Sequence, residues 1–156
     1  MLLAATFILT TSVSQVHATD GKNYPGSMCI RVTGGGGIPT ISDGGIGNAS
    51  STSTMRLECP AIKDQAFNID SGWVLVYDRH FSQAVKCSLH SRSPIYASIS
   101  PVVSSVGGSA TGPSETLRFG WRGGLSISRY FYSCEIPPAF NGAISYLVSY
   151  HVEEQE

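Results

Sequence analysis

The sequence predicts an all-β fold: an antiparallel β-sandwich of about eight strands that is cross-linked by disulfides, with a closed β-barrel as the alternative. Three observations support this prediction. Aromatic residues make up 10% of the chain, and β-branched residues are frequent, which favours strands over helices. The 17 glycines and 8 prolines interrupt the chain at short intervals. Apolar residues recur at alternate positions, as in half-buried strands, whereas no helical repeat extends beyond about two turns.

Eight segments carry the strand pattern. They are residues 28–32, 55–59, 73–77, 85–89, 96–103, 117–121, 130–136 and 144–152. Segment 73–77 is apolar on both faces, which suits a central strand that is covered on both sides. Leu147 is the exception to the alternation of segment 144–152. Pro101 confines segment 96–103 to a sheet edge or a bulge, because proline cannot donate to the ladder.

Residues 1–18 are expected to form a cleaved signal peptide, because an apolar stretch precedes small residues at positions 16 and 18. No basic residue precedes Lys22, so a buried first strand or an N-terminal anchor is the alternative. The apolar stretch is shorter than the roughly 20 residues that span a bilayer, so no stable membrane span is expected after cleavage. Residues 19–156 are expected to form a single domain. Within it, residues 33–54 are rich in Gly, Ser and Thr and are predicted to be a long flexible loop.

The four cysteines, Cys29, Cys59, Cys87 and Cys134, have no closely spaced pair, which disfavours a zinc site. In an exported protein they are expected to form two disulfides. Of the three possible pairings, the sequence favours Cys29–Cys59 and Cys87–Cys134, because the first closes the base of the 33–54 loop. The expected location is therefore secreted, either extracellular or periplasmic.

The charge pattern argues against some classes of partner. Charged residues make up 13% of the chain and the net charge is −1, so no basic surface is expected to attract phosphates. Nucleic-acid binding and electrostatic membrane docking are therefore disfavoured. The sequence has no nucleophile elbow, phosphate-binding loop or zinc-binding helix motif. We expect no metal and no cofactor.

Four residues are candidates for a binding surface: Trp121, Arg122, Trp73 and His80. Trp121 ends segment 117–121 where the chain turns, so its ring can leave the core and stack on a sugar. Arg122 beside it can donate several hydrogen bonds to a hydroxyl or a carboxylate. Trp73 offers a second flat ring. His80 lies in the densest polar cluster of the chain.

The function that these residues favour is a secreted, non-enzymatic binding or surface module, with carbohydrate or another extracellular protein as the partner. One alternative is a structural subunit of a surface fibre or coat, joined through exposed sheet edges and the 33–54 arm. A second alternative is a secreted hydrolase whose site would assemble from Asp78, His80 and His90.

Overall fold

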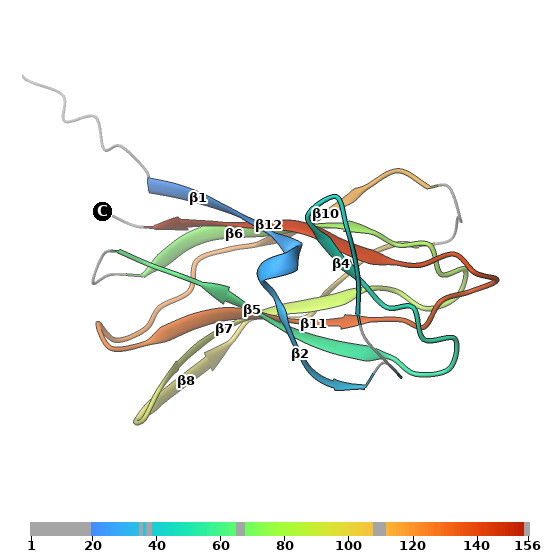
Figure 1. The fold of residues 1–156 in the computed structure, drawn as a ribbon. Coiled ribbons are helices and arrows are strands. Elements are labelled where there is room, and N and C mark those ends of the chain that lie inside the picture. Colours follow the sequence, from blue (N-terminus) through green and yellow to red (C-terminus); the bar gives the residue numbers. More distant parts are fainter. Residues whose placement is uncertain (1–19, 35, 37–38, 65–67, 108–111, 155–156) are drawn as a thin grey trace, which may run out of the picture.

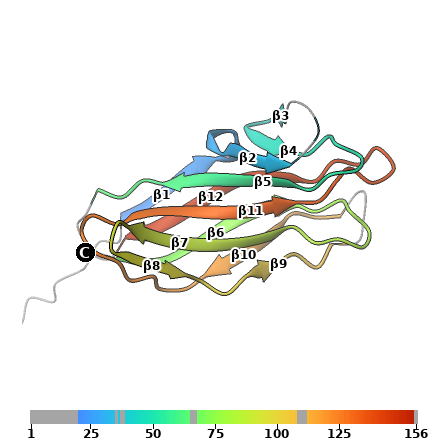
Figure 2. The same ribbon diagram turned by 90° about the horizontal axis from the view of Figure 1, so that it is seen from below.

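Two antiparallel β-sheets lie face to face and enclose the core (Figure 1). The computed structural model describes residues 20–34, 36, 39–64, 68–107 and 112–154, so the expected signal peptide lies outside the described residues. In sheet A the strand order is β10-β6-β12-β4-β3, and β1 also pairs with β12. In sheet B the order is β2-β5-β11-β7-β8, and β9 also pairs with β7 (Figure 2).

Successive strands of the chain alternate between the two sheets, except that β3 and β4 both lie in sheet A and β7, β8 and β9 all lie in sheet B. One 3-10 turn, η1 (Gly26–Met28), joins β1 to β2. Across the described residues there is no helix with the length and hydrophobicity needed to traverse a membrane. The strands are β1 (Asp20–Pro25), β2 (Ile30–Gly34), β3 (Thr40–Ser42), β4 (Gly45–Gly47), β5 (Met55–Ala61), β6 (Ile69–Tyr77), β7 (Lys86–Ser93), β8 (Tyr96–Ile99), β9 (Val103–Ser104), β10 (Glu115–Phe119), β11 (Arg129–Ile136) and β12 (Tyr146–Glu154).

The predicted sandwich is confirmed, and the barrel alternative is wrong because the two sheets do not close on each other. Each of the eight predicted segments overlaps a strand, but the described residues contain twelve strands. Three of the additional strands, β1, β3 and β4, lie in segments with no clear alternation. The fourth arises because the chain leaves the ladder at Pro101, which divides segment 96–103 into β8 and β9.

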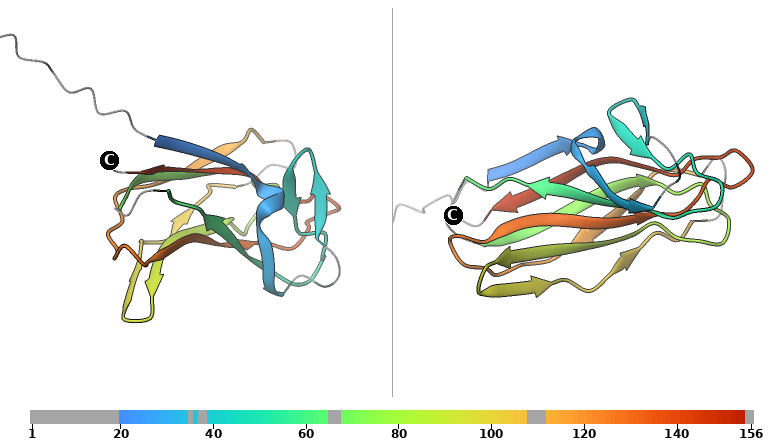
Figure 3. Two further views of the ribbon diagram at one scale, coloured as in Figure 1. Left: turned by 60° about the vertical axis from the view of Figure 1, so that its left-hand side comes forward. Right: turned by 60° about the horizontal axis from the view of Figure 1, so that its bottom comes forward.

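Segment 33–54 is not a loop throughout, which corrects the prediction. β3 and β4 form a hairpin there, and β4 pairs with β12. Its turn is Asp43-Gly44, with φ values of 50° and 78°, and an Asp-Gly pair adopts this left-handed region readily. The Ser27 N–H of η1 donates to the Gly44 carbonyl at 2.7 Å, which holds the hairpin beside η1 (Figure 3). The buried Asn48 side chain then donates to three backbone carbonyls at 2.8–3.1 Å.

A β-bulge explains why Leu147 interrupts the alternation of β12. Leu147 pairs with Val76 of β6, but the next β6 residue pairs with Ser149, so Val148 is the additional residue. Leu147 and Tyr150 both point into the core as a result, although they are three positions apart. The alternation of segment 144–152 predicts that Tyr146 and Val148 share the inner face with Tyr150. This is wrong, because the bulge places Tyr146 and Val148 on the outer side, where both are half-buried.

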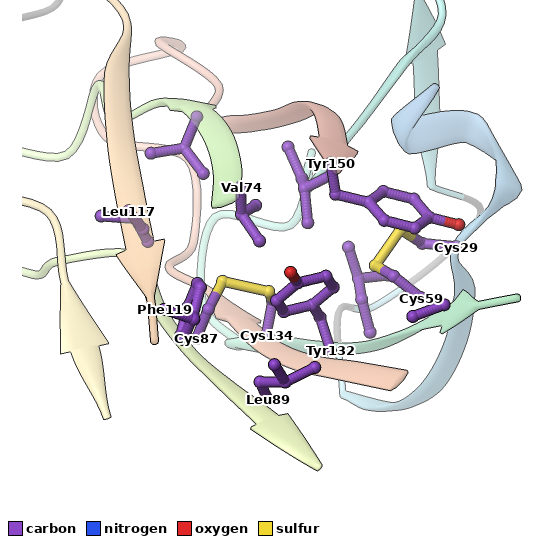
Figure 4. Packing of buried hydrophobic residues seen from close by; sticks show 14 of the residues in the cluster. Cys29, Cys59, Val74, Cys87, Leu89, Leu117, Phe119, Tyr132, Cys134 and Tyr150 are labelled. Carbon is purple, nitrogen blue, oxygen red and sulfur yellow. A yellow bond between two sulfur atoms is a disulfide. The ribbon is translucent and has the colours of Figure 1, made fainter. Parts of the chain in front are cut away.

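The core between the sheets contains both disulfides, Cys29–Cys59 and Cys87–Cys134, and these are the predicted pairings (Figure 4). Cys87 and Cys134 lie directly opposite each other on β7 and β11. The alternations predicted for β5, β7 and β11 are confirmed, because their inward residues are all nearly inaccessible to solvent. These inward residues are Met55, Leu57, Cys59, Cys87, Leu89, Tyr130, Tyr132, Cys134 and Ile136.

Two buried tyrosines connect the sheets in opposite directions (Figure 4). The Tyr132 hydroxyl of sheet B donates to the His151 carbonyl of sheet A at 2.7 Å. The Tyr150 hydroxyl of sheet A donates to the Pro60 carbonyl of sheet B at 3.0 Å. Gly72 of β6 makes room for the first bond, because a Cβ atom there would overlap the Tyr132 hydroxyl. Each hydroxyl is therefore satisfied inside the core, and each ring also packs against the other at 5.9 Å between centroids.

We expect the fold to lose stability in alkali because of these two tyrosines. Burial raises the pKa of Tyr150 to about 12 and raises the pKa of Tyr132 even further. In the unfolded chain both ionise near pH 10, so the free energy of unfolding should fall as the pH rises from about 10 to about 12. Phenolate absorbance and circular dichroism followed together during an alkaline titration test this. Full ionisation of all tyrosines with native dichroism retained would contradict it.

Candidate functional site

The outer side of sheet A carries a set of half-buried aromatic side chains that we call the aromatic face: Trp73, Tyr77, Tyr146 and His151. Trp73 and Tyr77 come from β6, and Tyr146 and His151 come from β12. The register pairs Trp73 with His151 and Tyr77 with Tyr146, so all four side chains lie on one side of the sheet. The Trp73 and His151 rings stack, with centroids 5.3 Å apart and planes 9° from parallel.

The bulge at Val148 is what assembles the aromatic face. Tyr146 and His151 are five residues apart, and an odd spacing in a regular strand places two side chains on opposite faces. The additional residue restores the same side for both. The prediction that segment 73–77 is covered on both sides therefore holds for its inner face alone: Val74 and Val76 are buried, whereas the outward side chains are half-buried.

Glycines on the neighbouring strands leave room for the rings of Tyr146 and His151 on β12. A Cβ atom on Gly47 of β4 would lie 2.6 Å from a carbon of the Tyr146 ring. A Cβ atom on Gly21 of β1 would lie 2.8 Å from a carbon of the His151 ring. Real Cβ atoms are not found this close to other atoms. The absence of a side chain at each glycine therefore lets the ring lie across the neighbouring strand at that position.

A hollow of about 160 Å³ lies at the Tyr77–Tyr146 end of the aromatic face. The Arg79 guanidinium carbon is 5.7 Å from the Tyr77 ring centroid and 6.0 Å from that of Tyr146, within the range of cation–π attraction. Ser42 and Asp43, from the β3–β4 hairpin, form the opposite wall. The hollow thus combines aromatic rings with a cation, a hydroxyl and a carboxylate, a set that suits a ligand with both an apolar face and hydroxyl groups.

At the Trp73–His151 end of the aromatic face, a row of four side chains crosses the sheet, with a polar residue at each end of the row. Arg118 of β10, Trp73, His151 and Asn23 of β1 are successive cross-strand neighbours. The His151 Nδ1 atom is 3.1 Å from the Asn23 Oδ1 atom, within hydrogen-bond distance. Polar groups therefore lie on both sides of the stacked pair of rings, Arg118 on one side and Asn23 on the other.

The structure does not bring the four sequence-predicted binding residues together. Trp121 follows β10 and is 56% exposed, and its ring lies against Gly123. The backbone of Arg122 pairs with that of Ile69, the first residue of β6, so Arg122 and the adjacent Trp121 lie at that end of the strand. Trp73 lies within β6, on the aromatic face. His80 lies beyond the other end of the same strand.

The side chains of His80 and of Asp78, its neighbour in the polar cluster, are held by hydrogen bonds within the turn that follows β6. Asp78 is buried and accepts hydrogen bonds from the backbone N–H groups of His80 and Val85, each at 3.1 Å. The His80 Nδ1 atom accepts from the N–H groups of Ser82 and Gln83 at 3.1 and 2.9 Å. His80 is 5% exposed and does not line the hollow of the aromatic face.

These contacts also bear on the hydrolase hypothesis, which required Asp78, His80 and His90 in one cleft. His90 belongs to β7 and lies on the outer side of sheet B, opposite the face that carries the core. Asp78 and His80 are both engaged in the turn that follows β6. Among the described residues, no group of His, Cys, Asp and Glu side chains is arranged to hold a metal ion.

Sequence reasoning missed Tyr77, Arg79 and Tyr146. A weak signal was present, because Tyr77 and Arg79 are alternate residues and therefore share a side of an extended chain. Tyr146 belongs to the aromatic face only because of the bulge, and the one indication of the bulge in the sequence is that Leu147 interrupts the alternation.

Comparison of the sequence with protein-family models and with curated proteins gives no match. The fold is similar to that of a low-affinity xylan-binding module, CBM86, from the gut symbiont Roseburia intestinalis. The TM-score is 0.53 with 13% sequence identity, over 87% of this chain and 96% of that chain. A family 6 carbohydrate-binding module gives a TM-score of 0.49 with 7% identity, over 86% of this chain and 94% of that one. The similarity to the CBM86 module shows that the two chains share the β-sandwich fold.

Proposed function

We propose that this chain is a non-enzymatic carbohydrate-binding module of an exported protein, and that the aromatic face of sheet A holds the sugar. The observation that carries the proposal is the hollow in which Tyr77, Tyr146 and Arg79 meet the β3–β4 hairpin. The sandwich fold shared with a xylan-binding module supports it. Two disulfides fit an oxidising compartment, and we include in the proposal a signal peptide over residues 1–18 and a single secreted domain over 19–156.

In the proposed complex, the apolar face of a sugar ring packs on an aromatic side chain, and the ring hydroxyls bond to the polar wall. Arg79 supplies donors, and Asp43 and Ser42 supply acceptors. The hollow is smaller than the roughly 300–1,000 Å³ of pockets for drug-sized ligands, so it holds one sugar ring. Further rings of a polysaccharide would continue along the sheet over Trp73 and His151.

Replacing Tyr77 or Tyr146 with alanine should abolish retention on an insoluble polysaccharide. The panel is insoluble xylan, cellulose and starch, and the measurement is the fraction of protein depleted from solution. Tyr96→Ala is the matched control, because Tyr96 is 38% exposed and lies on β8 of sheet B. Circular dichroism checks that each variant is folded. The proposal is overturned if the wild-type chain is not retained on any of the three polymers, or if the Tyr96 variant loses retention as fully as the Tyr77 variant.

Trp121→Ala tests the platform predicted from the sequence. Because the side chain is 56% exposed, its removal should cost less than about 1 kcal/mol of folding free energy, measured by thermal denaturation. A loss of about 3–5 kcal/mol would instead identify Trp121 as a residue that closes the core. Retention on polysaccharide should persist in this variant, since the proposed site lies elsewhere. Loss of retention in Trp121→Ala but not in Tyr77→Ala would move the site to the rim beside Arg122.

A further inference from the structure

A second candidate site lies on the outer side of sheet B, where β5, β11 and β7 run side by side (Figure 2). A groove of about 190 Å³ there is lined by residues of all three strands. We call it the sheet B groove. Its polar lining is two cations, one carboxylate and three neutral groups: Arg56, Lys86, Glu135, Ser88, His90 and Ser133.

The polar side chains of the sheet B groove are already organised by hydrogen bonds. The Arg56 Nε–H group donates to the Ser133 hydroxyl at 3.1 Å. The Ser88 hydroxyl and the His90 Nε2 atom are 2.9 Å apart. Ser88, His90 and Ser133 are each at most 9% exposed, so these groups are held within the groove wall and do not extend into solvent. Such preorganised polar groups lose little freedom when a ligand binds.

His90 leaves one ring nitrogen without a partner among the described residues. The buried Nδ1 atom forms no hydrogen bond, although the ring is 6% exposed and stacks on Phe131 with centroids 4.8 Å apart. Burial, and the nearby Arg92 and Arg56, lower the pKa of His90, so the ring is neutral at neutral pH. In either neutral tautomer, Ser88 occupies Nε2, and Nδ1 is left without a partner. A buried polar atom without a partner is unfavourable, so a small shift of the groove wall that lets a ligand hydroxyl reach Nδ1 would be favoured.

The two cations of the sheet B groove also lack carboxylate partners. Arg56 and Lys86 both lie opposite Glu135 in the register, yet neither forms an ion pair with any described residue. The Nε–H of Arg56 is used by Ser133, which leaves the two terminal amino groups of its guanidinium for a ligand. A guanidinium pairs most strongly with a planar carboxylate.

We propose that the sheet B groove binds a carboxylate-bearing sugar, a uronate, independently of the site on sheet A. Arg56 and Lys86 hold the carboxylate, while Ser88, Ser133 and His90 bond to the ring hydroxyls. Val102 lines the groove as well and offers an apolar surface to the ring. The proposal does not rest on the proposed function, because it uses different residues on the opposite sheet.

Nuclear magnetic resonance titration of the wild-type chain with sodium glucuronate tests this assignment, with glucose and sodium acetate as comparison ligands. The imidazole resonances of His90 should move with glucuronate and stay unchanged with glucose. No movement of His90 with glucuronate would overturn the proposal. An equal movement with acetate would also overturn it, since the groove would then be a site for simple carboxylates.

A variant pair tests the role of the guanidinium. Arg56→Gln should weaken glucuronate binding about tenfold or more, because the charge-assisted contact is lost. Arg129→Gln is the matched control: Arg129 is an exposed arginine of β11 that does not line the groove, and its replacement should leave glucuronate binding unchanged. Equal affinities in the two variants would overturn the proposal. Tyr77→Ala should also bind glucuronate normally, so failure of the sheet A site can be distinguished from failure of this one.

Discussion

Replacing Asp78 with alanine is expected to lower the free energy of unfolding by about 2–5 kcal/mol, from about 1–3 kcal/mol for each buried donor that loses its partner. The carboxylate is 3% exposed and sits where three segments meet. It accepts from the N–H groups of His80 and Val85 and from the hydroxyls of Ser105 and Ser145. Alanine would remove this acceptor from all four donors. The Val85 N–H group and the Ser105 hydroxyl keep each other's oxygen atoms as acceptors, whereas the His80 N–H group and the Ser145 hydroxyl lose the acceptor that they use here. A buried donor without a partner is costly.

Urea denaturation of Asp78→Ala and of the wild-type chain measures this effect. Asp78→Asn should be intermediate, because its amide keeps one acceptor oxygen but places two donors against existing donors. Asp70→Ala is the control: Asp70 is an exposed aspartate of β6, and its replacement should change the unfolding free energy by less than about 0.5 kcal/mol. A loss of less than about 1 kcal/mol for Asp78→Ala would show that the turn after β6 does not depend on this carboxylate.

Removal of the Cys87–Cys134 disulfide should have an effect of similar size. The bond closes a loop with a sequence separation of 47 residues, for which loop-closure entropy predicts a loss of about 4 kcal/mol. Both cysteines are almost fully buried, so replacing them with alanine also removes packing contacts. Total stabilities of single domains are roughly 5–15 kcal/mol, so this loss would be a large fraction of the whole.

The double variant Cys87→Ala/Cys134→Ala is to be compared with Cys29→Ala/Cys59→Ala by urea denaturation. The second bond has a separation of 30 residues, so its removal should cost slightly less. If a double variant does not fold, urea denaturation of the wild-type chain with and without reductant gives the combined loss of stability for both bonds. Equal stability of the Cys87→Ala/Cys134→Ala variant and the wild-type chain would contradict the prediction.

The inward side of the central strands could be predicted because their sequences alternate without interruption. In β5, for example, Met55, Leu57 and Cys59 are apolar and alternate with the charged Arg56 and Glu58, and a strand that buries one face must follow this pattern. The cysteine pairing was favoured because Cys29 and Cys59 flank the Gly/Ser-rich segment 33–54 and a bond between them closes its base. In both cases a local pattern determined the outcome.

The aromatic face could not be predicted, because it depends on neighbours that are distant in the sequence. Tyr146 lies beside Tyr77 only because β12 pairs with β6, and on the same side as His151 only because of the bulge. The hairpin wall comes from a Gly- and Ser-rich segment whose composition suggests a loop, yet Asp43-Gly44 forms a tight turn there. Trp121 was identified as exposed from its position at the end of a strand, which is again a local signal.

Because the chain passes from one sheet to the other after almost every strand, most strand pairs join segments that are far apart in the sequence. Hairpins such as β7–β8 can close in about 1–10 μs, but a sandwich dominated by distant pairings folds in milliseconds to seconds.

The disulfides also become possible at different times during synthesis. Cys29 and Cys59 can react once β5 has been made, whereas Cys87 must wait for β11, the second-to-last strand. Until β11 arrives, the thiol of Cys87 is open to the wrong partner, so correct oxidation depends on the first bond closing early.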